Sequence, residues 1–173
     1  MPIKNNADRL LKLVTELMDF RKMETGNLKL HLAQHDIVQF VHQMFNIFKD
    51  LALSKNISYH IEVPTTPLKI WMDSVQMEKV FFNLLSNAFK FTNNNGKISV
   101  VVTETDQEVT IQIRDNGVGI PESSKHKLFS DFFQIDIPGS DHIGSGIGLA
   151  LTKSIIVAHG GQISIESVEE TPE

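Results

Sequence analysis

Two asparagines and a lysine share one face of a predicted helix. Asn83, Asn87 and Lys90 are spaced four and three residues apart in a segment that is otherwise mostly apolar, so their side chains fall on one stripe. An amide oxygen is a hard ligand that suits magnesium, and a lysine ammonium suits a phosphate. The stripe therefore predicts a magnesium and phosphate site. The alternative is a pair of surface asparagines, or asparagines that bond back to their own helix.

A carboxylate and two glycines follow a predicted strand over 109–114. Asp115, Gly117 and Gly119 occupy alternate positions, which is typical of a tight turn where the backbone approaches a ligand. Asp115 could accept a hydrogen bond from an exocyclic amine such as that of adenine. The alternative is an ordinary Asp-Asn-Gly turn.

A second glycine-rich segment opens a predicted helix over 145–159. Its residues are Gly144, Ser145, Gly146, Ile147, Gly148 and Leu149. Glycines at the start of a helix let backbone N–H groups face phosphate oxygens, and the helix dipole adds to the attraction. The G-x-G-x-G spacing matches neither a Walker loop nor the dinucleotide-binding fingerprint.

Taken in order, these segments resemble the sequence boxes of the sensor histidine kinases of two-component systems. That family lies within the ATPase superfamily shared with DNA gyrase, the Hsp90 chaperones and the MutL repair proteins. The resemblance covers about residues 8–167. It comprises an asparagine box at 83–90, a first glycine box at 115–119, a phenylalanine box at Phe129, Phe132 and Phe133, a second glycine box at 144–148, and a helix end at His159, Gly160 and Gly161.

The resemblance implies an ATP-binding catalytic domain that uses ATP and Mg²⁺. Magnesium would be held by Asn83 and Asn87, and adenine would be read by Asp115. Gly117 and Gly119 would leave room for the ring, and Gln134 would reach magnesium or phosphate from a predicted lid over 134–143. The expected catalytic residues are Asn83, Asn87 and Lys90. The expected ATP contacts are Asn87, Lys90, Asp115, Gly117, Gly119, Gln134, Gly144, Ser145, Gly146, Gly148 and Leu149. The three phenylalanines would anchor the base of the lid to the core or to a helical stalk.

Asn83 separates two kinds of chemistry within the superfamily. By the family pattern, the true ATPases carry a glutamate one turn before the magnesium asparagine, where it activates water as a general base. Asn83 occupies that place here, and an amide cannot take a proton from water. The expected function is therefore transfer of the γ-phosphoryl group of Mg-ATP to a histidine. The alternatives are a degenerate module that binds nucleotide without transfer, and an ATP hydrolase of the same superfamily.

The acceptor histidine of the family is missing from the chain. Of the seven histidines, only His35, followed by Asp36 and Ile37, imitates the acceptor setting, but it lacks the basic residue that should follow. The acceptor is expected on a dimerisation and phosphotransfer hairpin in another segment, with a response-regulator aspartate as the next receiver. The parent protein is expected to be a homodimer.

Composition narrows the class without deciding the function. The chain has 173 residues, 41% of them hydrophobic, a net charge of −5 and no cysteine. The negative charge argues against a nucleic-acid partner, and the absence of cysteine excludes disulfides. No apolar run reaches the roughly 18–20 residues that cross a bilayer. The expected localisation is cytoplasmic, as the cytoplasmic part of a membrane-anchored sensor.

Periodicity predicts the elements that must position these residues. Apolar residues recur at spacings of 4, 3, 4 and 3 in a helix predicted over 3–23, which is typical of a coiled-coil seam: Ile3, Ala7, Leu10, Val14 and Leu17. By resemblance this helix is the distal part of the second hairpin helix, so residues 1–25 form a stalk and 26–173 the catalytic domain.

The remaining pattern predicts a two-layer α/β sandwich of the Bergerat type, with a mixed sheet and helices on one face. Strands are expected over 28–32, 57–63, 68–72, 97–103, 109–114 and 162–167. A helix over 37–52 would be capped by Asp36, and the asparagine-box helix by Asp73 or Ser74. The family's last strand is missing after 167, which predicts an unpaired sheet edge and a lower stability than that of a longer chain.

Overall fold

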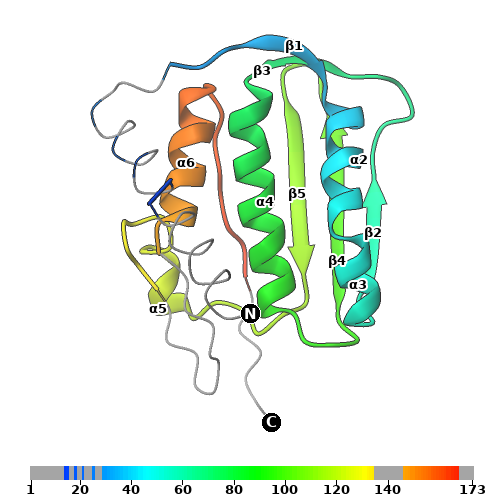
Figure 1. Cartoon of the computed structure of the whole chain (residues 1–173), viewed down its shortest axis with the longest axis vertical. Helices are drawn as coiled ribbons and strands as arrows, with labels where there is room; N and C mark the ends of the chain where they lie inside the picture. Colours follow the sequence, from blue (N-terminus) through cyan, green and yellow to red (C-terminus); the bar gives the residue numbers. More distant parts are fainter. Residues whose placement is uncertain are drawn as a thin grey trace. The chain divides into compact units, whose positions relative to one another are not determined.

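Figure 1 traces a computed structural model of the chain, which describes residues 14, 15, 18, 21, 25, 29–134 and 146–167. The chain divides into two compact units. One comprises His31–Glu122 with Glu166–Glu173, and the other comprises Met1–Leu30 with Ser123–Ile165. The described residues 14, 15, 18 and 21 are helical, and most of the predicted stalk lies outside the described residues.

Strands and helices alternate along the first unit. They are β1 (Ala33–Asp36), α2 (Ile37–Ile47), α3 (Lys49–Ser54), β2 (Ser58–Glu62), β3 (Lys69–Met72), α4 (Ser74–Phe91), β4 (Lys97–Glu104) and β5 (Val109–Asp115). The second unit contains most of α5 (Glu122–Lys125) and all of α6 (Gly148–Ala158). In the part of the chain that the structure describes, no helix has the length and apolar character needed to cross a membrane.

The main sheet of the first unit is mixed, as predicted. β4 lies at its centre, parallel to β2 and antiparallel to β5. β1 and β3 form a separate antiparallel ribbon. Helices α2 and α4 lie side by side on one face of the main sheet (Figure 1). The expected two-layer α/β architecture with helices on one face is confirmed.

Alternation along β4 explains why one face of the sheet is covered. Ile98, Val100 and Val102 are buried at every second position, because successive strand residues point to opposite faces. Against them α4 places Leu85 and Phe89, both at most 1% exposed. Aromatic rings fill the remaining space in three close pairs: Phe40 with Phe81, Phe48 with Phe89, and Phe45 with Tyr59.

Both predicted helix caps are present. Asp36 accepts a hydrogen bond from the Val38 N–H, and Asp73 accepts one from the Gln76 N–H. Each carboxylate therefore satisfies an N–H group that the first helical turn leaves without a partner. The sequence predicted Asp73 or Ser74 as the N-cap of α4, and the structure shows that it is Asp73.

Three predicted elements differ from the structure. The strand expected over 28–32 is wrong for its described part, since the strand begins at Ala33, where β3 supplies its partner. The helix expected over 37–52 is interrupted at Phe48 (φ −98°, ψ 1°), whose ring stacks on Phe89. Residues 162–167 are not a strand, although the Ser167 hydroxyl accepts a hydrogen bond from the Ile120 N–H.

Candidate functional site

Helix α4 carries the polar stripe predicted from the sequence. Asn83, Asn87 and Lys90 are half-buried, whereas Leu85 and Phe89 of the same helix are buried. The stripe therefore lies at the margin of the apolar face, where a ligand can reach it. Among the described residues, the Asn87 amide has no hydrogen-bond partner, so it does not bond back to its own helix. Its oxygen is available to a ligand.

Lys90 is held where water is partly excluded. Burial lowers the pKa of its ammonium, because a charged group is disfavoured in a less polar environment. Its Nζ lies 4.7 Å from the centroid of the Phe91 ring, within the range of a cation–π contact. An ammonium in this setting gains from an anionic partner such as a phosphate.

The first glycine box is a turn built on its own aspartate. Asp115 is the last residue of β5, and its Oδ1 accepts a hydrogen bond from the Gly117 N–H at 2.9 Å. Its Oδ2 makes no hydrogen bond to the described residues. Asn116 extends the pairing of β4 and β5 at the open end of their hairpin, since its Oδ1 accepts from the Lys97 N–H at 2.6 Å. The exposed Asp115 side chain thus retains one free acceptor oxygen at the end of the strand.

This turn contacts the end of the asparagine-box helix. The Val118 N–H donates to the Phe91 carbonyl oxygen at 3.3 Å, and a Cβ at Gly117 would lie 2.5 Å from the same oxygen. Gly119 has a φ of 71°, in the region that glycine adopts readily. The structure therefore brings the first glycine box and α4 together. The sequence pattern indicated a tight turn and room for a ring at Gly117, but it did not predict this contact with the Phe91 backbone.

The second glycine box meets the phenylalanine box within the other unit. Gly146 has a φ of 70°, and a Cβ there would lie 2.8–2.9 Å from the backbone of Phe132, itself at a φ of 60°. Helix α6 begins at Gly148 after the buried Ile147, and no side chain of the described residues caps it.

The remaining residues of these boxes differ in how exposed they are, and some lie outside the described residues. Phe132 is 58% exposed, so it is not buried in the core, one of the two places expected for it. The other, the helical stalk, lies mostly outside the described residues. Leu149 is half-buried and Gln134 is exposed. Gly144, Ser145 and lid residues 135–143 lie outside the described residues.

Similarity to known proteins agrees with this arrangement. Residues 72–172 match the family described as "Histidine kinase-, DNA gyrase B-, and HSP90-like ATPase". The chain belongs to this family. It is a catalytic ATP-binding domain of the histidine kinase type, as the motifs predicted.

Two relatives illustrate the similarity in this family. Histidine kinase P4 of Formosa agariphila is 36% identical over 167 residues, which cover 94% of this chain and 12% of that protein. The alginate biosynthesis sensor protein KinB of Pseudomonas aeruginosa is 33% identical over 165 residues, covering 95% and 27%. The chain therefore spans a small part of the length of the curated relatives that it matches.

Solved structures of histidine kinases share the fold. Full-length ShkA, crystallised in complex with AMPPNP, superposes with a TM-score of 0.80 at 26% identity, covering 92% of this chain and 33% of that one. The nucleotide-free catalytic domain of ThkA superposes with a TM-score of 0.67 at 26% identity, covering 75% and 83%. ATP binding thus belongs to the family.

Proposed function

We propose that this chain binds Mg-ATP through α4 and the Asp115 turn, and transfers the γ-phosphoryl group to a histidine on a separate helical hairpin. The observation that carries the proposal is the amide of Asn87, which has no hydrogen-bond partner in the described part of the chain and shares a helix face with Asn83 and Lys90. In a member of this ATPase family, such an amide is best explained as a ligand group.

The oxygens of Asn83 and Asn87 fit Mg²⁺. Both are neutral, hard donors one helical turn apart, and magnesium accepts a few such oxygens together with water and phosphate. When bound, the ion would neutralise charge on the phosphates. Among the described residues there is no cluster of three or more His, Asp or Glu that would hold a metal instead.

The other residues take complementary roles. Lys90 would pair with a phosphate, and the free Oδ2 of Asp115 would accept a hydrogen bond from the exocyclic amine of adenine. Gly117 and Gly119 keep the turn that presents Asp115. The second glycine box, with Gly144, Ser145, Gly146, Gly148 and Leu149, is assigned to ATP from its motif, and so is Gln134.

Transfer is favoured over hydrolysis because Asn83 cannot act as a base. Phosphoryl transfer has a loose transition state, so catalysis depends on positioning and on charge neutralisation. A site without a base for water should keep ATP intact until a better nucleophile arrives. We assign that role to an acceptor histidine of the parent kinase, followed by a response-regulator aspartate. Because ATP is the donor, we place the domain on the cytoplasmic side.

Calorimetric titration with ATP, with and without Mg²⁺, tests the binding site. We expect binding that requires magnesium, and a loss of about tenfold or more in affinity for Asn87→Ala, since a lost ligand to a charged group is worth roughly 1.5–3 kcal/mol. Asn46→Ala is the matched control, because Asn46 is an exposed asparagine of α2. Equal affinity in the Asn87 and Asn46 variants would refute the assignment.

The reaction is tested by adding a helical hairpin with an acceptor histidine from a relative, together with ATP labelled at the γ-phosphate. We expect acid-labile label on the hairpin and little free phosphate. Steady phosphate release without labelling would identify a hydrolase. ATP binding without either product would identify a degenerate module.

A further inference from the structure

An aspartate closes each end of the β1–β3 ribbon. Asp36 ends β1 and caps α2, and its Oδ1 accepts from the N–H groups of both Val38 (3.0 Å) and Leu68 (3.1 Å). Asp73 follows β3 and caps α4. Its Oδ1 accepts from the Gln76 N–H (3.1 Å) and its Oδ2 from the His31 N–H (2.9 Å). Each carboxylate therefore joins the start of a helix to the opposite side of the ribbon.

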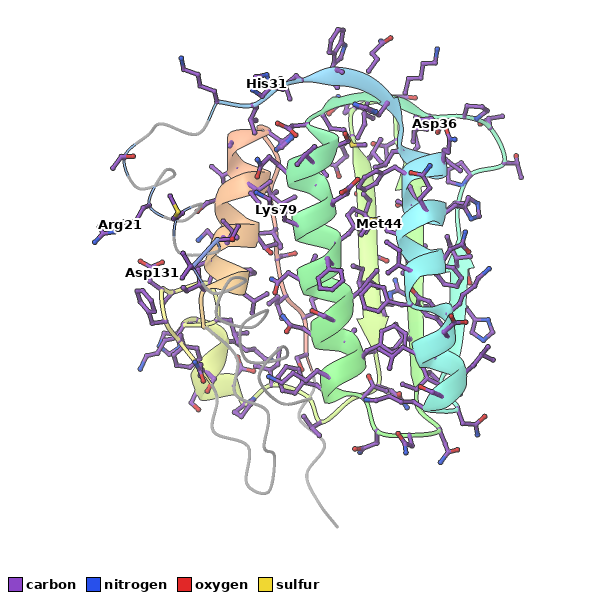
Figure 2. The ribbon with its side chains drawn as sticks, viewed as in Figure 1. Arg21, His31, Asp36, Met44, Lys79 and Asp131 are labelled. Carbon is purple, nitrogen blue, oxygen red and sulfur yellow. The ribbon has the colours of Figure 1, made fainter. Side chains whose placement is uncertain are left out.

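A different helix starts at each end of the ribbon. Figure 2 shows His31 on one side of β1, just before the strand begins, and Asp36 at the far end of the strand. The Asp36 end holds α2, which carries none of the proposed site residues. The Asp73 end holds α4, which carries Asn83 and Asn87 about 15 and 21 Å farther along the helix at 1.5 Å per residue.

Asp73 is well suited to fix the position of a helix. It is only 4% exposed, so its hydrogen bonds compete little with water, and hydrogen bonds to a carboxylate are stronger than neutral ones. The positive end of the helix dipole adds to the attraction. Because its two oxygens serve different partners, Asp73 holds α4 and His31 at the same time.

We propose that Asp73 is a positioning residue for ATP: by holding the start of α4 to the His31 backbone, it sets where Asn83 and Asn87 stand. The inference rests on the proposed function, because it concerns the same α4 residues. β3 leads directly into α4 through Asp73, so loss of the bond to His31 leaves the start of α4 attached to β3 but removes its tie to the chain before β1. The start of α4 is then held less firmly, and the magnesium ligands lose their fixed position.

The two aspartates allow a sharp test, because asparagine caps a helix about as well as aspartate does. An asparagine has one acceptor oxygen. Asp36→Asn can keep its hydrogen bonds to Val38 and Leu68, which share Oδ1, whereas Asp73→Asn must lose the bond to Gln76 or the bond to His31, because these use different oxygens. For Asp73→Asn we expect the Kd for Mg-ATP to rise about tenfold, the worth of one charge-assisted hydrogen bond, and hydrogen exchange at the His31 amide to accelerate. For Asp36→Asn we expect both quantities to stay within about twofold.

Asp36→Ala separates positioning from stability. It removes a cap and a ribbon bond from α2, so the melting temperature should fall while the Kd for Mg-ATP stays unchanged. The inference is overturned if Asp36→Ala weakens ATP binding as much as Asp73→Asn does. It is also overturned if Asp73→Asn binds as the wild type does, or leaves exchange at His31 unaltered. Absence of binding by the folded wild-type chain would instead refute the proposed function, and this inference with it.

Discussion

Lys90 shows how a single side chain links local environment to ligand binding. Burial lowers the pKa of its ammonium, so the positive charge is lost at a lower pH than for an exposed lysine. If the charge pairs with phosphate, ATP affinity should fall as the pH rises through this lowered pKa.

The measurement is the Kd for Mg-ATP between about pH 8 and 11, where lysine ordinarily titrates near 10.4. Lys90→Arg is the control, because arginine keeps its charge throughout this range. We expect a decline in the wild type and a flatter profile in the arginine variant. Identical profiles would show that Lys90 does not pair with the nucleotide.

Tyr59 is a buried hydroxyl with no hydrogen-bond partner among the described residues. Its ring stacks on Phe45 at 3.9 Å and meets Phe89 edge-on at 5.0 Å. An unsatisfied buried polar group costs about 1–3 kcal/mol. Tyr59→Phe keeps the ring packing and removes the hydroxyl, so we expect the free energy of unfolding to increase by about 1 kcal/mol. Denaturant unfolding measures it, and a decrease would contradict the prediction.

Burial of Tyr59 also predicts that the folded state becomes less stable at alkaline pH. Burial raises the pKa of the Tyr59 phenol above its ordinary value, which is near 10 in the unfolded chain. Above about pH 10 the unfolded state loses this proton and the folded state retains it, so stability falls as the pH rises. Tyr59→Phe should remove this part of the decline.

At the scale of elements, the contact between the first glycine box and α4 is the junction that matters for the site. A Cβ at Gly117 would lie 2.5 Å from the Phe91 carbonyl oxygen, so the turn or the helix end must move to admit one. We expect Gly117→Ala to lower the free energy of unfolding by about 1–3 kcal/mol and to weaken ATP binding.

Gly161→Ala is the control for this substitution, since its Cβ would lie 3.1 Å from the Ile156 Cγ2 methyl and 3.3 Å from the Ile156 carbonyl oxygen, both farther than the 2.5 Å contact at Gly117. Its effect on stability should stay within about 0.5 kcal/mol. Equal stability and equal ATP affinity in the two variants would show that the Gly117 contact is dispensable.

At the scale of the whole molecule, ligand binding should appear as stability. A ligand at 100 times its Kd stabilises the folded state by about 2.7 kcal/mol when it binds only that state. We expect Mg-ATP to raise the melting temperature of the chain, and the same concentration to raise that of Asn87→Ala much less. Differential scanning calorimetry measures both, with ATP and a chelator as the control. An equal rise in both proteins would place the nucleotide elsewhere.

The domain organisation remains a prediction at this scale. The stalk over residues 1–25 and its boundary with the catalytic domain fall mostly outside the described residues.

The sequence by itself determined what depends on neighbours along the chain. The stripe on α4 follows from helical periodicity, and the caps at Asp36 and Asp73 follow from side chains bonding N–H groups two or three residues away. The β4–β5 hairpin follows from two alternating runs joined by a short turn. These features need only local geometry, and so do the motifs that identify the family.

Tertiary structure decided what depends on distant partners. β1 begins at Ala33 and not within 28–32, because a strand forms where another strand can pair with it, here β3. Gly117 must be glycine because the Phe91 carbonyl, far earlier in the chain, lies against it. The second oxygen of Asp73 finds a partner 42 residues away, at His31. Periodicity carries no information about such contacts, since they arise only when packing brings separate segments together.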